Sequence, residues 1–244
     1  MRKVKLTVFG LMFCLLLHLT GGCAAAQKPL RVTLVLKTVT EVAEFWGTLL
    51  SGVEKAAEEY GVELKVLTSP REIDIDKQIE LIRQVTADKP DVMILSAADY
   101  DRCAEATEEA IAAGIGVVAI DTDVNAAGRA CFVGSNSYEI GLEMGRAMAS
   151  YLPEGGKVAV IQHMLTTTTG IERTRGVLDA LNEAGNIEIL GSFCCDNSTE
   201  QAQTITTELL SADPEIRGFV CTNEVCNVGA ANALVELGMG GRVY

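Results

Sequence analysis

A set of aromatic, acidic, amide and guanidinium side chains stands where apolar segments of this sequence end or where the next segment begins. The set comprises Phe45, Trp46, Asp121, Asp123, Arg173, Asn197 and Asn223. Flat aromatic rings pack against the C–H faces of a sugar, while carboxylates, amides and a guanidinium bond its hydroxyl groups. These residue types therefore favour the binding of a monosaccharide or a related polyol.

Each of these residues also has a purely structural explanation. Phe45 continues the apolar face of a predicted helix, whereas Trp46 is out of phase with that face and is the stronger ligand candidate. Asp121 and Asn197 also suit turns or helix caps, and Arg173 an ordinary surface charge. Their convergence on one set of loops favours the functional interpretation.

Catalytic motifs are absent from the sequence. No G-x-G-x-x-G follows the apolar run ending at Leu36, and neither G-x-x-x-x-G-K-[ST] nor a G-x-S-x-G after a strand occurs. His163 is the only histidine beyond the leader and has no clear acid or cysteine partner, so it is either a ligand hydrogen bonder or a loop residue. We therefore expect a binding protein without a cofactor, not an enzyme.

The cysteines that follow the leader do not form a metal motif. They are Cys103, Cys131, Cys194, Cys195, Cys221 and Cys226. No pair has C-x-x-C spacing, and adjacent Cys194 and Cys195 would form only a strained bridge. In an exported chain, either some of these thiols pair or the source habitat is reducing. The sequence leaves both alternatives open.

From residue 31 onward the chain alternates short β-rich runs with longer amphipathic stretches. The first half predicts strands at 32–36, 62–67, 91–95 and 117–120. A helix between the first two ends at Gly61, and its apolar face carries Phe45, Leu49, Val53, Ala56 and Tyr60. The second half predicts strands at 157–161, 187–193 and 218–222, with a further strand beginning at 242–244. This alternation is typical of parallel sheets with helices on both faces.

The segment 121–136 interrupts the alternation and contains Gly128 and Gly134, so it is the candidate hinge between two lobes, 31–134 and 135–244. The predicted fold class is α/β, with two doubly wound, Rossmann-like lobes. Ligands of such sheets bind outside the carboxyl ends of the strands. The loops after the strands of both lobes should therefore surround one cleft.

The first 23 residues combine a basic start, an apolar run at 6–17 and the ending Leu-Thr-Gly-Gly-Cys23. They predict a secretory signal peptide, because the apolar run is shorter than the roughly 20 residues of a membrane-spanning helix. The ending is similar to a bacterial lipobox, in which Cys23 is lipidated, and cleavage near 24–26 is the alternative. Residues 24–30 would then link the lobes to a lipid anchor in the membrane. The net charge of -13 argues against a nucleic-acid partner.

Taken together, these features resemble the sugar-binding periplasmic binding proteins of the ribose-binding type. The similar elements are Phe45-Trp46 before a helix reaching Gly52, the strand end at Asp121, Val133-Gly-Ser-Asn136, Glu172-Arg173-Thr-Arg175-Gly176 and Thr222-Asn223-Glu224. The resemblance implies a type I fold and a monomer, either periplasmic or anchored on the outer face of the cytoplasmic membrane. Such a protein closes on a sugar and delivers it to an ABC transporter permease. A signalling subunit that presents the sugar to a sensor kinase or chemoreceptor is the alternative.

The resemblance also implies roles for individual residues. The aromatic pair would stack on the sugar ring, Asp121 would accept sugar hydroxyls, and Arg173, Asn197 and Asn223 would contact the ligand. Two departures put ribose itself in doubt: Ala43 replaces an asparagine of the ribose pattern and Thr122 an arginine. Another pentose, a hexose, inositol or a sugar-like signal is equally compatible. Because the pattern continues with elements that this sequence lacks, we expect the last structural elements to be missing.

Overall fold

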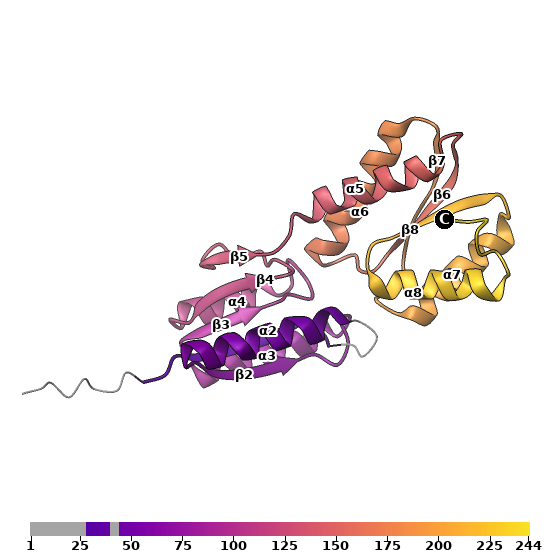
Figure 1. Cartoon of the computed structure of the whole chain (residues 1–244). Coiled ribbons are helices and arrows are strands. Elements are labelled where there is room, and N and C mark those ends of the chain that lie inside the picture. Colours follow the sequence, from indigo (N-terminus) through magenta and orange to yellow (C-terminus); the bar gives the residue numbers. More distant parts are fainter. Residues whose placement is uncertain (1–27, 40–43) are drawn as a thin grey trace, which may run out of the picture.

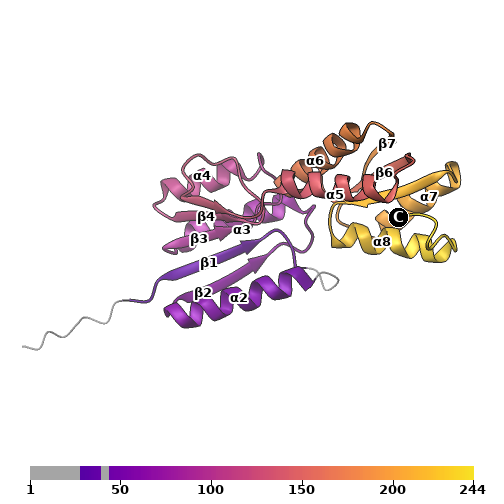
Figure 2. The same cartoon turned by 45° about the horizontal axis from the view of Figure 1, so that its top comes forward.

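The structure is a computed structural model that describes residues 28–39 and 44–244. The predicted signal peptide, Cys23 and Ala43 lie outside these residues. Within the described ranges, no helix is long and apolar enough to cross a membrane. The described chain forms two α/β lobes, each built on its own parallel sheet (Figures 1 and 2).

The first lobe contains a five-stranded sheet in the order β2-β1-β3-β4-β5, with every pair parallel. The strands are β1 (Arg31–Leu36), β2 (Glu63–Thr68), β3 (Val92–Leu95), β4 (Gly116–Ile120) and β5 (Cys131–Val133). Helix α2 (Glu44–Tyr60) covers one face, where Trp46 packs with Leu34 and Leu36. Helices α3 (Ile75–Asp88) and α4 (Ala104–Ala112) cover the other. Because both faces are covered, the central strands are continuous apolar runs.

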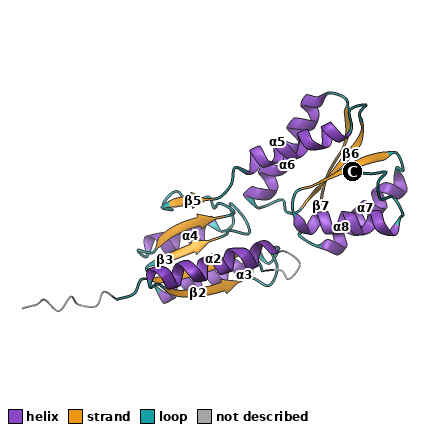
Figure 3. Cartoon of the chain, in the orientation of Figure 1, coloured by secondary structure: helices purple, strands orange, loops and turns teal. Residues whose placement is uncertain are grey.

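The second lobe contains a three-stranded parallel sheet in the order β7-β6-β8. The strands are β6 (Gly156–Gln162), β7 (Ile187–Cys194) and β8 (Ile216–Cys221). Helices α5 (Ser137–Tyr151) and α6 (Thr168–Ala184) enclose one apolar cluster against the sheet. Helices α7 (Thr199–Ala212) and α8 (Glu224–Glu236) enclose a second cluster on the opposite face (Figure 3).

Helices α5 and α6 approach each other closely because glycines stand at their contact. A Cβ atom added at Gly141 would lie 2.1 Å from the carbonyl oxygen of Arg173, and one added at Gly176 would lie 2.2 Å from that of Tyr138. No side chain fits at these distances. The two glycines therefore fix the position of the α6 backbone that carries Arg173.

The chain passes from the first lobe to the second between β5 and α5, through residues 134–136 (Figure 1). The loop between β6 and α6 also bonds directly to the first lobe. The Thr166 hydroxyl donates to the Ala98 carbonyl at 2.8 Å, and the Tyr100 amide donates to the Thr166 carbonyl at 3.0 Å. The loops at the carboxyl ends of the two sheets are therefore in direct contact.

The structure confirms the predicted alternation of strands and helices and, with it, the fold class. Residues 242–244 form no strand of the described sheets, although the Tyr244 amide donates to Arg217 O at 2.9 Å and the Phe219 amide donates to Tyr244 O at 2.8 Å. The predicted break over 121–136 is wrong in part, since it contains β5, which pairs with β4. That strand is only three residues long, so its apolar run Cys131-Phe-Val133 is too short to stand out as a strand in the sequence.

The predicted buried face of α2 is wrong in part, because Leu49 and Val53 pack on the core as predicted but Phe45 and Tyr60 do not. Trp46 is only 5% exposed, whereas Phe45 is 49% and Tyr60 76% exposed. Leu49, Leu50 and Val53 pack against the cluster that contains Trp46. The predicted and observed faces share Leu49 and Val53, and they differ in that the sheet buries Trp46 and leaves Phe45 exposed.

Candidate functional site

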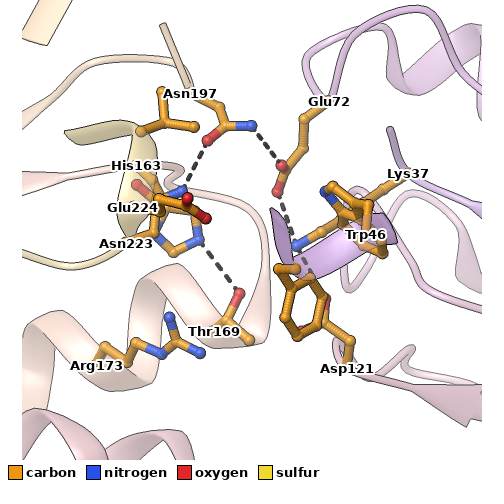
Figure 4. A pocket seen from close by; sticks show the side chains of 12 residues that line it. Lys37, Trp46, Glu72, Asp121, His163, Thr169, Arg173, Asn197, Asn223 and Glu224 are labelled. Carbon is orange, nitrogen blue, oxygen red and sulfur yellow. Dashed lines mark hydrogen bonds and ion pairs between the residues drawn. The ribbon is translucent and has the colours of Figure 1, made fainter. Parts of the chain in front are cut away.

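A cavity of about 240 Å³ lies between the two lobes, at the carboxyl ends of their strands. The first lobe contributes charged and aromatic side chains, and the second contributes amides, a hydroxyl, an imidazole and a guanidinium. The lining residues are Lys37, Phe45, Trp46, Glu72, Asp121, His163, Thr169, Arg173, Asn197, Asn223, Glu224 and Val225. Figure 4 shows most of these side chains converging from the two sides. The volume is below the roughly 300–1,000 Å³ of sites for drug-sized molecules, so the cavity suits a smaller ligand.

The first-lobe wall contains a buried ionic cluster, defined as Lys37, Glu72 and Asp121. Lys37 directly follows β1, and its Nζ lies 2.9 Å from Glu72 Oε1 and 3.3 Å from Asp121 Oδ2. Burial alone would lower the pKa of the Lys37 ammonium, but the two carboxylates outweigh burial and raise that pKa above its usual value. Lys37 is therefore a fixed cation held between two anions.

Asp121 has a strained backbone, with φ at 60° in the left-handed region. Aspartate tolerates this conformation better than most residues, so the position is a turn as well as a cavity wall. The Ser96 hydroxyl donates to Asp121 Oδ2 at 3.3 Å and orients the carboxylate. The neighbouring Thr122 is fully buried, and its hydroxyl donates to the Ala97 carbonyl at 2.7 Å.

A polar chain crosses the cleft from the ionic cluster to the second lobe. Asn197 Nδ2 donates to Glu72 Oε2 at 3.0 Å, and Asn223 Nδ2 donates to Asn197 Oδ1 at 2.8 Å. Asn223 Oδ1 in turn accepts from the Cys226 amide at 2.9 Å, which caps the first turn of α8. Asn197 has φ at 54°, so it also shapes the turn after β7. Each asparagine therefore has a structural role, in a turn or a helix cap, and also lines the cavity.

His163 is buried at the back of the second-lobe wall and lies within hydrogen-bonding distance of two hydroxyl groups. Its Nδ1 is 2.8 Å from Thr222 Oγ1, and its Nε2 is 3.3 Å from Thr169 Oγ1. Burial, together with the positive charges of Lys37 and Arg173, holds the pKa of His163 well below its usual value. The imidazole is therefore neutral at physiological pH and acts as a hydrogen-bonding group.

Arg173 projects from α6 toward the cavity, on the side opposite Asp121 (Figure 4). Its Nη1 donates to the Thr222 carbonyl at 2.9 Å, while its buried Nε has no hydrogen-bond partner within the described chain. Burial lowers the pKa of the guanidinium, and Asp121 partly opposes this effect. Arg173 is thus a partly buried cation with donor capacity left for a ligand.

The two aromatic rings meet edge to face, with centroids 5.0 Å apart and planes at 78°. Lys37 Nζ lies 5.8 Å from the centroid of the Trp46 ring, within the range of a cation–π contact. Trp46 is therefore held by the sheet below it and by the ionic cluster beside it. The more exposed Phe45 ring is the one free to adapt to a ligand.

The structure brings together all of the sequence-predicted residues except Asp123. The Asp123 carboxylate instead faces Arg129, with Asp123 Oδ1 2.7 Å from Arg129 Nε. Sequence reasoning missed Lys37, Glu72 and Thr169. A lysine directly after a buried strand was a usable signal, whereas Glu72 lies in a loop beyond β2 and reaches the site only through the fold.

The residues that line the cavity can bind a small molecule through hydrogen bonds. Among the described residues, no group of three or more histidine, cysteine, aspartate or glutamate side chains is placed to hold a metal ion. The lining supplies three carboxylates that accept hydrogen bonds, two amides that accept and donate them, a lysine and an arginine that donate, and two aromatic rings. Such a set can bind several hydroxyl groups of one small molecule.

Comparison with known proteins gives one consistent result. The family model described as "Periplasmic binding protein domain" matches residues 33–244. The D-allose-binding periplasmic protein of Escherichia coli is 26% identical over 97% of this chain and 75% of its own length. The D-ribose/D-allose-binding protein of Pseudomonas aeruginosa is 25% identical over 89% of this chain and 69% of its own. The crystal structure of a sugar transporter from Clostridium phytofermentans is 28% identical, with a TM-score of 0.82, covering 87% of this chain and 78% of that one.

These matches cover both lobes and confirm the resemblance inferred from the motifs. The chain belongs to the periplasmic binding protein domain family, whose members are solute-binding proteins.

Proposed function

We propose that this protein captures a sugar or sugar-like polyol between its two lobes and delivers it to an ABC transporter permease. The observation that carries the proposal is the cavity wall itself, where the buried Nε of Arg173 has no partner among the described residues and the guanidinium faces Asp121 across the space between the lobes. A ligand with several hydroxyl groups would bond both sides at once. Membership of the family and the sugars bound by the relatives support the same ligand class.

The charges of the cavity favour a neutral ligand. The buried Lys37 is paired with Glu72 and Asp121, and Arg173 supplies a second positive charge. Among the described lining residues, the charges of Lys37 and Arg173 balance those of Glu72 and Asp121, and the exposed Glu224 adds one negative charge. An anionic ligand would have to leave water without a free counter-charge from these residues, whereas an uncharged polyol would only exchange hydrogen bonds.

Ligand capture would proceed by closure of the lobes about residues 134–136, which connect β5 to α5. Lobe 31–134 would present the ionic cluster and the aromatic pair, and lobe 135–244 would present Arg173 and the two asparagines. A ligand that contacts both walls stabilises the closed arrangement over the open one by its additional contacts. The closed surface would then be the form that a permease recognises.

Calorimetric titration with a panel of monosaccharides tests the proposal, with tryptophan fluorescence as a second signal. Trp46 is the only tryptophan of the chain and lines the cavity, so its emission reports directly on the site. We expect one sugar to bind with a matching fluorescence change. Absence of heat and of a fluorescence change across pentoses, hexoses and inositol would sink the proposal.

A matched pair of aspartate variants locates the site. Asp121→Asn removes a cavity carboxylate that accepts from ligand hydroxyls, and we expect it to raise Kd by roughly 10- to 100-fold, the value of a hydrogen bond to a charged group. Asp123→Asn lies two positions away but alters a carboxylate that faces Arg129, so Kd should change by less than about threefold. An equal loss in both variants would contradict this placement of the site.

We further propose that Cys23 is lipidated and holds the lobes at the outer face of the membrane. The support is the Leu-Thr-Gly-Gly-Cys ending of an apolar leader. Fractionation of cells that express the full chain tests this, with mass spectrometry of the mature N-terminus. The wild type should be found in the membrane fraction with an acylated cysteine, and Cys23→Ala should not. Wild type in the soluble fraction with an unmodified N-terminus would overturn the anchor.

A further inference from the structure

Three thiols lie together at the cleft end of the second lobe. Cys195 follows β7, Cys221 ends β8, and Cys226 lies in the first turn of α8. The Sγ atoms of Cys195 and Cys226 are 3.4 Å apart, and both side chains are fully buried. The two residues are 31 positions apart in the chain, so the contact joins segments that only the fold brings together.

Backbone hydrogen bonds hold both thiols in place behind the cavity wall. The Cys195 amide donates to the Gln162 carbonyl at 2.9 Å, which ties it to the end of β6. The Cys226 amide donates to Asn223 Oδ1 at 2.9 Å. Asn223 bonds Asn197, which stands two residues after Cys195. The thiol pair and the asparagine pair are therefore parallel links between the same two segments.

We propose that Cys195 and Cys226 form a redox site, in which oxidation joins them by an intramolecular disulfide behind the asparagines of the cleft. A disulfide needs an S–S distance of about 2.05 Å, so the sulfur atoms must approach by about 1.4 Å. The covalent link would hold Asn197 and Asn223 in the arrangement that lines the cavity. Its effect on ligand binding rests on the proposed function, whereas the bond itself does not.

The oxidant is a disulfide of the exchange type, as carried by the thiol oxidases of compartments that receive exported chains. The Cys195 thiolate attacks one sulfur of that disulfide, forms a mixed disulfide and expels the other sulfur as a thiolate. Cys226 then loses its proton and attacks the Cys195 sulfur, which releases the second thiol of the oxidant. Two thiols of the protein lose two protons and two electrons, and the oxidant gains both as two thiols.

The surroundings of the cysteines favour this pair over the neighbouring thiols. The hydrogen bond from Cys226 lowers the pKa of Cys195, which makes Cys195 the better nucleophile. Burial raises the pKa of Cys221 to about 12 and that of Cys194 to about 11. Cys194 also points to Asp196, with its Sγ 3.3 Å from Asp196 Oδ1. Neither neighbour combines a short S–S contact with a lowered thiol pKa.

The experiment compares reduced protein with protein treated with diamide, a small azo oxidant that takes up the two protons and two electrons. Peptide mapping after alkylation of the remaining thiols should find Cys195 linked to Cys226 in the wild type. A cross-link that closes a loop of this length should raise Tm by roughly 4–16 °C relative to the reduced form. Cys221→Ser is the matched control and should retain both the link and the shift, whereas Cys226→Ser should lose them.

The outcomes separate this proposal from the proposed function. A map with no Cys195–Cys226 link, or with Cys221 or Cys194 as the partner, overturns the redox site, and this comparison within the wild type does not depend on a variant that folds. If the link forms and Tm rises while no sugar binds either form, the proposed function fails and the redox site stands. If a sugar binds, its affinity should be at least as high in the oxidised form, and a loss of affinity contradicts the supporting role of the link.

Discussion

The two walls of the cleft are stabilised in different ways. The first lobe holds its polar side chains by charge, through the buried ionic cluster of Lys37, Glu72 and Asp121. The second lobe relies mainly on neutral hydrogen bonds, which place Asn197, Asn223 and the uncharged His163. Arg173 is the exception, a single cation that pairs with a backbone carbonyl.

The difference predicts which wall is rigid before a ligand arrives. Removal of one ion from a buried cluster leaves an uncompensated charge, so the first wall is strongly coupled. Each neutral hydrogen bond of the second wall contributes only about 0.5–1.5 kcal/mol, so its side chains reorient more easily. The positions of the side chains on the second wall therefore depend on backbone packing, above all on the close contact of α5 and α6. Variants of each wall can test this contrast.

The largest effect is expected at Lys37. Lys37→Met keeps the length of the side chain but leaves Glu72 and Asp121 buried without a counter-ion, and we expect it to lower the free energy of unfolding by about 3–5 kcal/mol. Lys65→Met is the matched control, because Lys65 pairs with Asp88 in solvent, with both side chains more than 40% exposed. Its effect should be below about 1 kcal/mol. Urea unfolding measures both, and equal losses would contradict the charge-based description of the first wall.

A smaller effect is expected where backbone packing sets the second wall. Gly141→Ala places a Cβ atom 2.1 Å from the Arg173 carbonyl oxygen, so α5 and α6 must separate. We expect a loss of about 1–3 kcal/mol in stability, together with weaker ligand binding because Arg173 moves. Gly52→Ala is the control in α2, where a Cβ atom meets nothing within 4 Å. It should stabilise the protein by up to about 1 kcal/mol, through better helix propensity alone.

Denaturant titration and calorimetric sugar titration measure the two consequences of Gly141→Ala. Loss of stability with unchanged sugar affinity would show that Arg173 does not depend on the α5–α6 contact. The contrast between the walls would then have to rest on the hydrogen bonds alone.

The sequence predicted the fold well because alternating apolar runs of suitable length encode a parallel sheet with helices on both faces. It located Asp121, Asn197 and Asn223 because residues directly after strands must lie at the carboxyl edge of a sheet. Glu72 was missed because it stands in a loop and lies near Lys37 only in the folded chain. Asp123 was included because its position in the sequence does not show that Arg129 lies beside it.

The orientation of α2 shows a different limit of sequence reasoning. Phe45 and Trp46 are adjacent, and each begins a plausible apolar stripe along the helix. The choice between the stripes depends on which side chains the sheet offers, and Leu34 and Leu36 form the surface that receives Trp46. Periodicity gives the existence of a buried face, and packing decides which face it is.

The smallest effect tests the neutral character of the second wall. The pKa of His163 in the fold lies well below its unfolded value of about 6.5, so below pH 6.5 the unfolded chain binds more protons than the folded one. Stability is therefore complete above about pH 6.5 and declines as the pH falls toward the folded pKa. From pH 6.5 to 5.5 the loss due to this group should be about 1 kcal/mol.

His163→Gln isolates this contribution, since glutamine is polar but does not titrate. The variant is expected to be less stable than the wild type at pH 7.5, yet its stability should fall by about 1 kcal/mol less between pH 6.5 and 5.5. Urea unfolding at both pH values measures the difference between the two proteins, in which the titration of the carboxylates cancels. An identical decline in both would mean that His163 is charged in the fold. The second wall would then carry a buried cation beside Arg173, and the contrast between a charged and a neutral wall would fail.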